Sequence, residues 1–198
     1  MIKLVIFDIG GVLIDFSEKY YYEYLSSKTG ISIERLAQDI DPIINRMELG
    51  KMSLDIFENT LLKKFGIRRN KIAWNLIFHK KAKLKKDVYE LAKRISRRYT
   101  VVLLSNISIS RYLAARKILR DDGVFRRRFA SCYLGVRKPD RKIYNYVIRK
   151  MNVKPSEAVF IDNMEENTEG AEAVGINGIR FRNCAQTTKK LERLGVKV

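Results

Sequence analysis

The sequence is poor in the residues that build disulfide frameworks, zinc sites and histidine-dependent catalysis. It has 198 residues, with two cysteines and one histidine. Two cysteines are too few for a disulfide scaffold, so we expect Cys132 and Cys184 to be reduced thiols. No spacing of cysteine and histidine resembles a zinc site. A Ser-His-Asp or Cys-His mechanism would depend on His79, which stands beside lysines in a context typical of a solvated helix end.

Long apolar runs are also missing. Residues 4–7 are apolar but are followed by Asp8, and residues 12–14 are apolar but are followed by Asp15. Both runs are far shorter than the roughly 20 residues that a membrane-spanning helix needs. No segment has the long apolar region of an export signal. We therefore expect no membrane association and a cytoplasmic location.

Acidic residues are strongly outnumbered. The chain has 40 Lys and Arg against 22 Asp and Glu, which gives a formal net charge of +18. Such an excess is compatible with binding to nucleic acid or anionic ligands, or with a basic proteome whose charges are spread over the surface. Basic residues occur in every segment, so we favour the second explanation and expect at most weak, non-specific nucleic-acid binding. The densest stretch comprises Lys63, Lys64, Arg68, Arg69, Lys71, Lys80, Lys81, Lys83, Lys85 and Lys86, and a second cluster is Arg126 to Arg128.

The hydrophobic pattern changes its period along the chain. Residues 2–7 are typical of a buried strand, and the following segment to residue 79 is helical in pattern. The predicted helices there run from Ser17 to Gly30, from Ser32 to just before Pro42, from Ser53 to Gly66, and over 69–79. From residue 87 onward, helices (87–99, 110–123, 139–153, 165–175) alternate with strands (100–106, 130–135, 157–163, 177–181).

Strands separated by helices indicate a parallel sheet covered on both faces. The sequence therefore predicts an α/β fold with a Rossmann-like core made of residues 1–15 and 86–198. Residues 16–85 form a helical insertion directly after the first strand. With 46% hydrophobic residues the chain can fill one such core.

Polar residues follow the predicted strands, where an open parallel sheet binds its ligands. These residues are Asp8, Gly10 and Gly11 after the first strand, Ser105 and Asn106 after the second, Arg137, Lys138 and Pro139 after the third, and Asp162 and Asn163 after the fourth. An aspartate can attack phosphorus and form an acyl phosphate. A divalent cation between Asp8 and Asp162 would offset charge, while Ser105 and Lys138 would hold the phosphate oxygens.

Four segments in this order resemble the motifs of the haloacid dehalogenase (HAD) superfamily. They are FDIGGVLID, VVLLSN, GVRKPDRKIY and VFIDNMEENTEGAEAVGI, and ELGKMSLDIFENTLLKKFG resembles part of the helical cap of the phosphatase-like branch. The resemblance implies a Rossmann-like core, a cap domain at 16–85 and Mg²⁺-dependent hydrolysis through an aspartyl intermediate. It assigns catalysis to Asp8 and Lys138, phosphate binding to Ser105, Asn106 and Lys138, and metal binding to Asp8, Gly10, Asp162 and Asn163.

Two positions depart from the usual motifs. Most phosphatases of this superfamily have an aspartate two residues after the nucleophile, which protonates the leaving group and then activates water, but this chain has Gly10. The second residue of the acidic pair is Asn163, which brings an oxygen but no charge. The resemblance therefore implies slow hydrolysis that favours leaving groups needing little protonation, unless another carboxylate such as Asp15 or Glu166 serves as the acid.

Three functions remain open at this point. The first is a slow phosphatase acting on a small phosphorylated metabolite, for example a sugar phosphate. The second is a weakened or inactive relative that binds an anionic ligand or a macromolecule, which the two departures favour. The third is a metal-free dehalogenase using Asp8 on carbon, which Gly10 disfavours because that branch usually has a bulky aromatic residue there. We expect a monomer or a homodimer.

Overall fold

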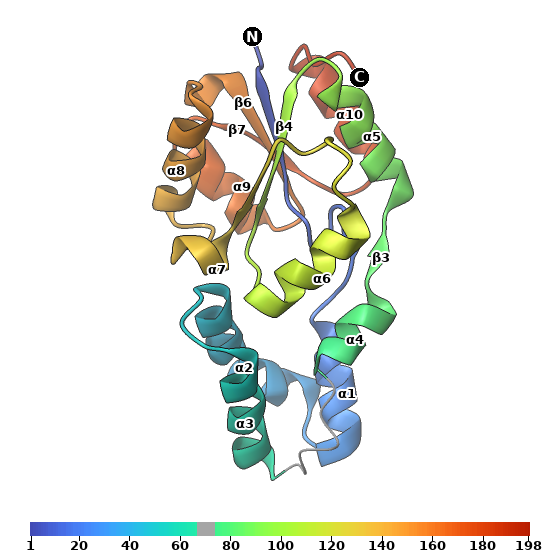
Figure 1. Ribbon diagram of the computed structural model, residues 1–198, viewed down its shortest axis with the longest axis vertical. Coiled ribbons are helices and arrows are strands. Elements are labelled where there is room, and N and C mark those ends of the chain that lie inside the picture. Colours follow the sequence, from blue (N-terminus) through green and yellow to red (C-terminus); the bar gives the residue numbers. More distant parts are fainter. Residues whose placement is uncertain (67–73) are drawn as a thin grey trace.

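The computed structural model describes residues 1–66 and 74–198. Its centre is a five-stranded sheet in the order β5-β4-β1-β6-β7, with every neighbouring pair parallel (Figure 1). The strands are β1 (Leu4–Phe7), β4 (Thr100–Ser105), β5 (Arg127–Ala130), β6 (Ala158–Asp162) and β7 (Asn177–Arg180). From β1 the chain builds outward to β5, then returns to the other side of β1 for β6 and β7. The predicted Rossmann-like α/β fold is confirmed.

Alternate residues of the central strand pack into two apolar cores. Val5 and Phe7 belong to one core, and Leu4 and Ile6 to the other. Because side chains alternate across a strand, a sheet covered on both faces needs apolar residues at every position. The first core includes residues of α5 (Lys86–Ser96), α6 (Ile109–Leu119) and α10 (Cys184–Arg193), and the second includes residues of α8 (Arg141–Met151) and α9 (Glu165–Glu172).

The helical insertion lies beyond the carboxyl end of the sheet, at the bottom of Figure 1. Its helices are α1 (Lys19–Thr29), α2 (Ile33–Glu48), α3 (Leu54–Phe65) and α4 (Trp74–Lys81). The chain enters through β2 (Ile14–Asp15) and leaves through β3 (Lys83–Leu84), which pair with each other in antiparallel fashion. The proposed boundaries at residues 16 and 85 lie next to these strands, and the division into two domains stays a prediction.

Local signals set several helix ends as predicted. Ser32 and Ser53 accept hydrogen bonds from backbone N–H groups in the first turns of α2 and α3. Gly30 and Gly66 end α1 and α3 in the left-handed conformation that glycine adopts without strain. Ser17 lies one residue before the N-cap position, which Glu18 occupies, but its Oγ accepts a hydrogen bond from the backbone N–H of Lys19, the first residue of α1.

The predicted end of α2 was also wrong. We expected the helix to stop before Pro42, but it continues through the proline to Glu48. Proline removes one helical hydrogen bond, yet the burial of one apolar face compensates for that loss. The buried apolar residues of this face are Leu36, Ile40, Ile44 and Met47, which keep a helical spacing on both sides of the proline. Continuing the helix brings Glu48 to the edge of the sheet.

The third strand of the core lies earlier than predicted. We placed a strand at 130–135, whereas β5 ends at Ala130 and residues 131–134 form the short helix α7 (Ser131–Leu134). The strand begins with two arginines, and its position at the sheet edge tolerates such charged residues. Because of these charges, the hydrophobic pattern did not predict a strand at this position. The sequence also did not predict α10 or the β2–β3 pair.

Other features are described only in part. The predicted helix over 69–79 is seen from Trp74 to Lys81, and its earlier residues and the side chain of His79 lie outside the described part of the chain. The same holds for Arg68, Arg69 and Lys71 of the basic stretch. Both cysteines are free, as predicted. No helix within residues 1–66 and 74–198 is long and apolar enough to span a membrane.

Candidate active site

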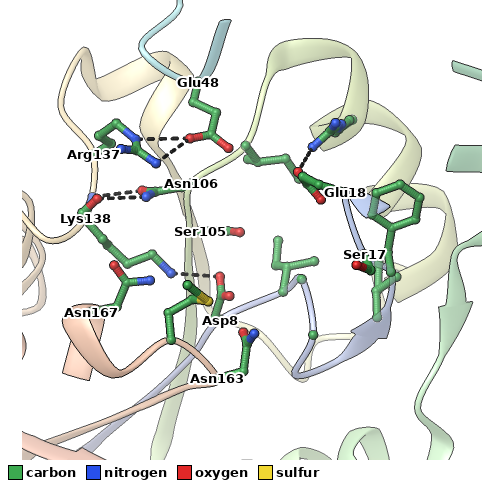
Figure 2. Close-up of a pocket in the computed structure, with 18 of the residues that line it drawn as sticks. Asp8, Ser17, Glu18, Glu48, Ser105, Asn106, Arg137, Lys138, Asn163 and Asn167 are labelled. Carbon is green, nitrogen blue, oxygen red and sulfur yellow. Dashed lines mark hydrogen bonds and ion pairs between the residues drawn. The ribbon is translucent and has the colours of Figure 1, made fainter. Parts of the chain in front are cut away.

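A cavity of about 590 Å³ opens between the carboxyl edge of the sheet and the helical insertion (Figure 2). Six of the predicted site residues line it: Asp8, Gly10, Ser105, Asn106, Lys138 and Asn163. They come from the ends of β1, β4 and β6 and from the loop between α7 and α8. The parallel sheet brings these separate segments together at one edge, where its strand order reverses beside β1. The seventh predicted residue, Asp162, lies behind the cavity wall.

Asp8 and Lys138 form a buried ion pair at the centre of this wall. The Nζ atom of Lys138 lies 2.9 Å from Oδ1 of Asp8, and the residues are 1% and 6% exposed, respectively. Burial raises the pKa of Asp8 to about 6, although the charge of Lys138 opposes that shift. Burial alone would lower the pKa of Lys138, but the carboxylates of Asp162 and Asp8 raise it above its usual value. Lys138 is therefore a permanent positive charge beside the carboxylate.

Asp162 supports Lys138 from behind. Its Oδ2 lies 2.5 Å from Nζ of Lys138 and also accepts a hydrogen bond from Asn167, while Oδ1 accepts one from the backbone of Met164. The residue is fully buried. Because both oxygens already have protein partners, the geometry favours a positioning role for Asp162, and the metal-binding role expected from the resemblance stays a prediction.

Asn106 fixes the backbone on which Lys138 stands. Its Oδ1 accepts a hydrogen bond from the Lys138 N–H at 2.8 Å, and its Nδ2 donates one to the Lys138 carbonyl at 2.9 Å. Both polar groups of the side chain are thus hydrogen-bonded to the loop that carries Lys138, which favours a structural contribution over direct phosphate binding. Ser105 is buried in the cavity wall, and its hydrogen bond to Asp8 partly opposes the rise in the pKa of Asp8.

Two consecutive glycines follow Asp8 closely in the chain, and only the second position requires glycine. A Cβ atom built on Gly10 would meet no atom within 4 Å. At Gly11, φ is +76°, and a Cβ would come within 2.8 Å of the Asn163 side chain. Gly11 therefore needs glycine for both conformation and space, whereas position 10 has room for a side chain.

The donors at this wall fit a magnesium ion. Oxygen ligands are what Mg²⁺ prefers, and Asp8, the backbone carbonyl of Gly10 and the Asn163 amide can supply them. Among the described residues, no donor forms a well-aligned hydrogen bond with Oδ1 of Asp8, which has only the ion pair with Lys138. In addition, the buried set of Asp8, Asp162 and Lys138 carries one excess negative charge. A divalent cation would offset that charge.

The same site is poor in carboxylates for a metal centre. In the part of the chain that the structure describes, no group of three or more His, Cys, Asp or Glu side chains is placed to hold an ion. Asn163 contributes an oxygen without charge. These two facts predict weak binding of Mg²⁺ by the protein alone.

Two arginine–carboxylate pairs line another part of the cavity, and neither pairing was predicted from the sequence. Arg111 of α6 pairs with Glu18, and its guanidinium carbon lies 4.6 Å from the centre of the Tyr21 ring. Arg137 donates a hydrogen bond from Nε to Oε2 of Glu48 at 3.1 Å, and its Nη2 forms an ion pair with the same oxygen at 3.0 Å. Each pair joins the helical insertion or the segment leading into it to the sheet core. The sequence did place Arg137 near the site, because it is next to Lys138.

Comparison with known proteins agrees with this architecture. The family model of haloacid dehalogenase-like hydrolases matches residues 2–175. The chain is 26% identical to a sesquiterpene phosphatase of Aspergillus oryzae, over 97% of this chain and 96% of that protein. It is 29% identical to a D-ribitol-5-phosphate phosphatase of Bacteroides thetaiotaomicron, over 96% and 97% of the two chains.

A solved structure shares the fold. It is a HAD family enzyme from Bacteroides thetaiotaomicron, in complex with magnesium and inorganic phosphate, with a TM-score of 0.78 and 21% identity over 92% of this chain and 95% of that one. At this level of identity the likeness shows the fold alone. The family model, in contrast, covers most of the sequence, and the chain therefore belongs to the haloacid dehalogenase-like hydrolases.

Proposed function

We propose that the protein is a magnesium-dependent phosphatase that hydrolyses a small phosphorylated metabolite through an aspartyl-phosphate intermediate on Asp8. The observation that carries the proposal is the buried ion pair of Asp8 and Lys138 facing the cavity. A carboxylate held at a strand end, beside a fixed positive charge and a hydroxyl group, is arranged to attack a bound phosphate.

In the first step, an oxygen of Asp8 attacks phosphorus and the bond to the leaving oxygen breaks. Lys138 and Ser105 hold the non-bridging oxygens and offset their charge during the attack. Asp162 and Asn106 keep Lys138 in place through its ammonium group and its backbone, respectively. In the second step, water attacks the phosphorus of the aspartyl phosphate and the carboxylate of Asp8 is released.

Asp8, the carbonyl of Gly10 and Asn163 would hold the Mg²⁺ ion. When bound, it lowers the repulsion between the nucleophile and the phosphate and absorbs charge on the phosphate oxygens. The excess negative charge of the buried Asp8, Asp162 and Lys138 set supports this proposal. The single carboxylate among the ligands supports a weak affinity that the substrate phosphate itself increases.

Unless another group in the cavity gives a proton, the reaction is slow for leaving groups that need one. General acid–base assistance contributes typically about 10²- to 10⁴-fold, and residue 10 has no side chain to give it. Charged pairs from Glu18, Arg111, Glu48 and Arg137 line part of the cavity, beside apolar side chains. The charged groups favour a leaving group that carries hydroxyl groups, such as that of a sugar or polyol phosphate.

The proposal is tested by a screen of phosphorylated metabolites with and without Mg²⁺. The parent protein should release phosphate only with the metal, and Asp8→Asn should lose that activity while keeping its fold. Asp55→Asn is a matched control, because it makes the same change on the exposed surface of α3. A parent protein that binds phosphate but turns over no ester would instead support the weakened, anion-binding alternative.

A further inference from the structure

The proposed reaction leaves one proton unassigned. When an alkyl phosphate is cleaved, the departing alkoxide needs a proton, and the later attack by water needs a base. Gly10 can supply neither. Any replacement must come from a carboxyl group that faces the same cavity. Besides Asp8, the carboxylates lining the cavity are Asp15, Glu18, Glu48 and Glu166.

Burial separates these four candidates. The side chain of Asp15 is 66% exposed, and Glu166 is exposed as well. Side chains so open to water are poorly fixed in orientation, and the ion pair of Asp15 with Lys85 is long, at 3.9 Å. Glu18 is partly exposed, and its Oε1 is bound to Arg111. Glu48 is only 7% exposed although it lines the cavity.

The carboxyl group of Glu48 is held by one oxygen. The hydrogen bond from Nε of Arg137 and the ion pair with its Nη2 both involve Oε2. Figure 2 shows the other oxygen of Glu48 pointing away from Arg137, toward the interior of the cavity. This is the arrangement that a general acid needs, because one oxygen fixes the direction while the other carries the proton.

The backbone around Glu48 is fixed against the core. Its carbonyl accepts a hydrogen bond of 2.6 Å from the Ser131 hydroxyl, which itself accepts one from the backbone N–H of Ile107. Gly50 packs so tightly on the carbonyl of Cys132 that a Cβ atom there would lie 2.2 Å from its oxygen. The position of Glu48 therefore follows from close contacts between α2 and the core.

The charges around Glu48 allow it to hold a proton. Burial raises its pKa above the usual value, opposed first by Arg137 and then by Arg111, while Glu18 adds to the rise. A general acid works best when its pKa lies near the working pH. The direction of this shift is the one that such a role requires.

We propose that Glu48 is the general acid and base of this active site, in place of the side chain that residue 10 lacks. In the first step the bond between phosphorus and the leaving oxygen breaks, and the proton on Glu48 moves to that oxygen and forms the alcohol. In the second step the carboxylate of Glu48 takes a proton from water as the water oxygen bonds to phosphorus. The bond between phosphorus and Asp8 breaks, and phosphate leaves. This role rests on the proposed phosphatase function.

The test is Glu48→Gln, assayed with Mg²⁺ on phosphate esters of graded leaving-group pKa. Glutamine keeps an oxygen for Arg137 but has no acidic proton. We expect kcat/KM for alkyl phosphates to fall by about 10²- to 10⁴-fold, the typical worth of general acid catalysis, with little change for nitrophenyl phosphate. The dependence of rate on leaving-group pKa therefore becomes steeper.

Two further variants separate this role from a purely structural one. Glu34→Gln makes the same change on the exposed surface of α2 and should leave the leaving-group dependence as in the parent. Glu48→Asp keeps an acid on a shorter side chain and should recover part of the alkyl phosphate activity lost in Glu48→Gln. The rate with alkyl phosphates should also decline in the parent as pH rises through the pKa of Glu48, and this decline should vanish in Glu48→Gln.

The outcomes that would overturn the proposal are distinct. If Glu48→Gln slows all esters by one common factor, Glu48 only joins the insertion to the core and is not the acid. If Glu48→Gln does not fold, Glu48→Asp decides, since a leaving-group dependence far steeper than the parent's in a protein that keeps its acid would contradict the role. A parent protein without any Mg²⁺- and Asp8-dependent hydrolysis would remove the proposed function itself, and with it this inference.

Discussion

Lys138 lies 2.9 Å from the carboxylate of Asp8, and both residues are almost completely buried. A second buried carboxylate, Asp162, contacts the same ammonium group from the other side. Two negative charges thus share one positive charge away from water. This imbalance leads to opposite predictions for the stability of variants that lack Lys138 and variants that lack the charge of Asp8.

Lys138→Met should destabilise the protein severely. The substitution leaves two buried carboxylates without their cation, and breaking a buried ion pair in this way typically costs about 3–5 kcal/mol. The loss should shrink at acidic pH, where the carboxyl groups take up protons. Urea unfolding at several pH values measures it, and Lys142→Met on the exposed side of α8 is the control. A loss below about 1 kcal/mol at neutral pH would argue against the buried triad.

Asp8→Asn should stabilise the protein in the absence of metal at neutral pH. The pKa of Asp8 is raised from 3.8 to about 6, so its ionised form is less favourable in the folded protein than in the unfolded chain. The folded parent therefore loses stability as pH rises from about 4 to about 6, and the asparagine variant escapes this loss. The shift corresponds to at most about 3 kcal/mol.

Thermal unfolding of the metal-free proteins at pH 4 and pH 7.5 checks this sign. Asp8→Asn should have the higher Tm at pH 7.5, and the difference should narrow at pH 4. Asp55→Asn should behave like the parent at both pH values. A lower Tm for Asp8→Asn at pH 7.5 would mean that the Lys138 ion pair outweighs the burial of the carboxylate.

Asn163→Asp should tighten Mg²⁺ binding. It adds a negative charge at nearly unchanged size, so its contact with Gly11 is kept. Each unit charge near a divalent ion contributes on the order of 1 kcal/mol or more, which predicts at least about a fivefold gain in affinity. Calorimetric titration measures it, with Asn145→Asp on the surface of α8 as the control. An unchanged affinity would show that residue 163 does not face the metal.

Gly10→Asp should speed the hydrolysis of alkyl phosphates in the Glu48→Gln background and flatten the dependence on leaving-group pKa there. The structure leaves open space at a Cβ on residue 10, so the substitution has little steric cost. A new acid near the leaving oxygen is worth up to about 10²- to 10⁴-fold where proton transfer limits the rate. In the parent, where Glu48 already gives the proton, the gain should be much smaller. A folded protein with both substitutions that is no faster than Glu48→Gln on any alkyl ester would refute this prediction.

The sequence predicted the sheet edge and its residues because both follow from local patterns. Asp8 directly follows a buried strand, Ser105 and Asp162 each end one, and parallel strands that run side by side end at a common edge. Local sequence patterns could not predict which of these side chains face the cavity. Asp162 turned inward to Lys138, and Asn106 bound the neighbouring loop, because each had a backbone or side-chain partner from a distant segment.

Glu48 lies beyond the end that the sequence predicted for α2. A proline in a helical pattern predicts the end of the helix, but the buried positions Ile40, Ile44 and Met47 continue the helical period past Pro42. Its pairing with Arg137 joins residues far apart in the chain and depends on how the insertion packs on the core. Local sequence patterns cannot predict such a pairing between distant residues.

The most direct test of the account is to look for phosphate covalently attached to Asp8. The parent protein is mixed with nitrophenyl phosphate and Mg²⁺, quenched in acid within the first turnover, digested and analysed by mass spectrometry. We expect one phosphate on the peptide that contains Asp8, accompanied by a burst of nitrophenol, and neither signal in Asp8→Asn. Phosphate on another residue, or an Asp8→Asn protein that retains more than about 1% of the parent rate, would contradict it, because loss of a covalent nucleophile typically costs several powers of ten.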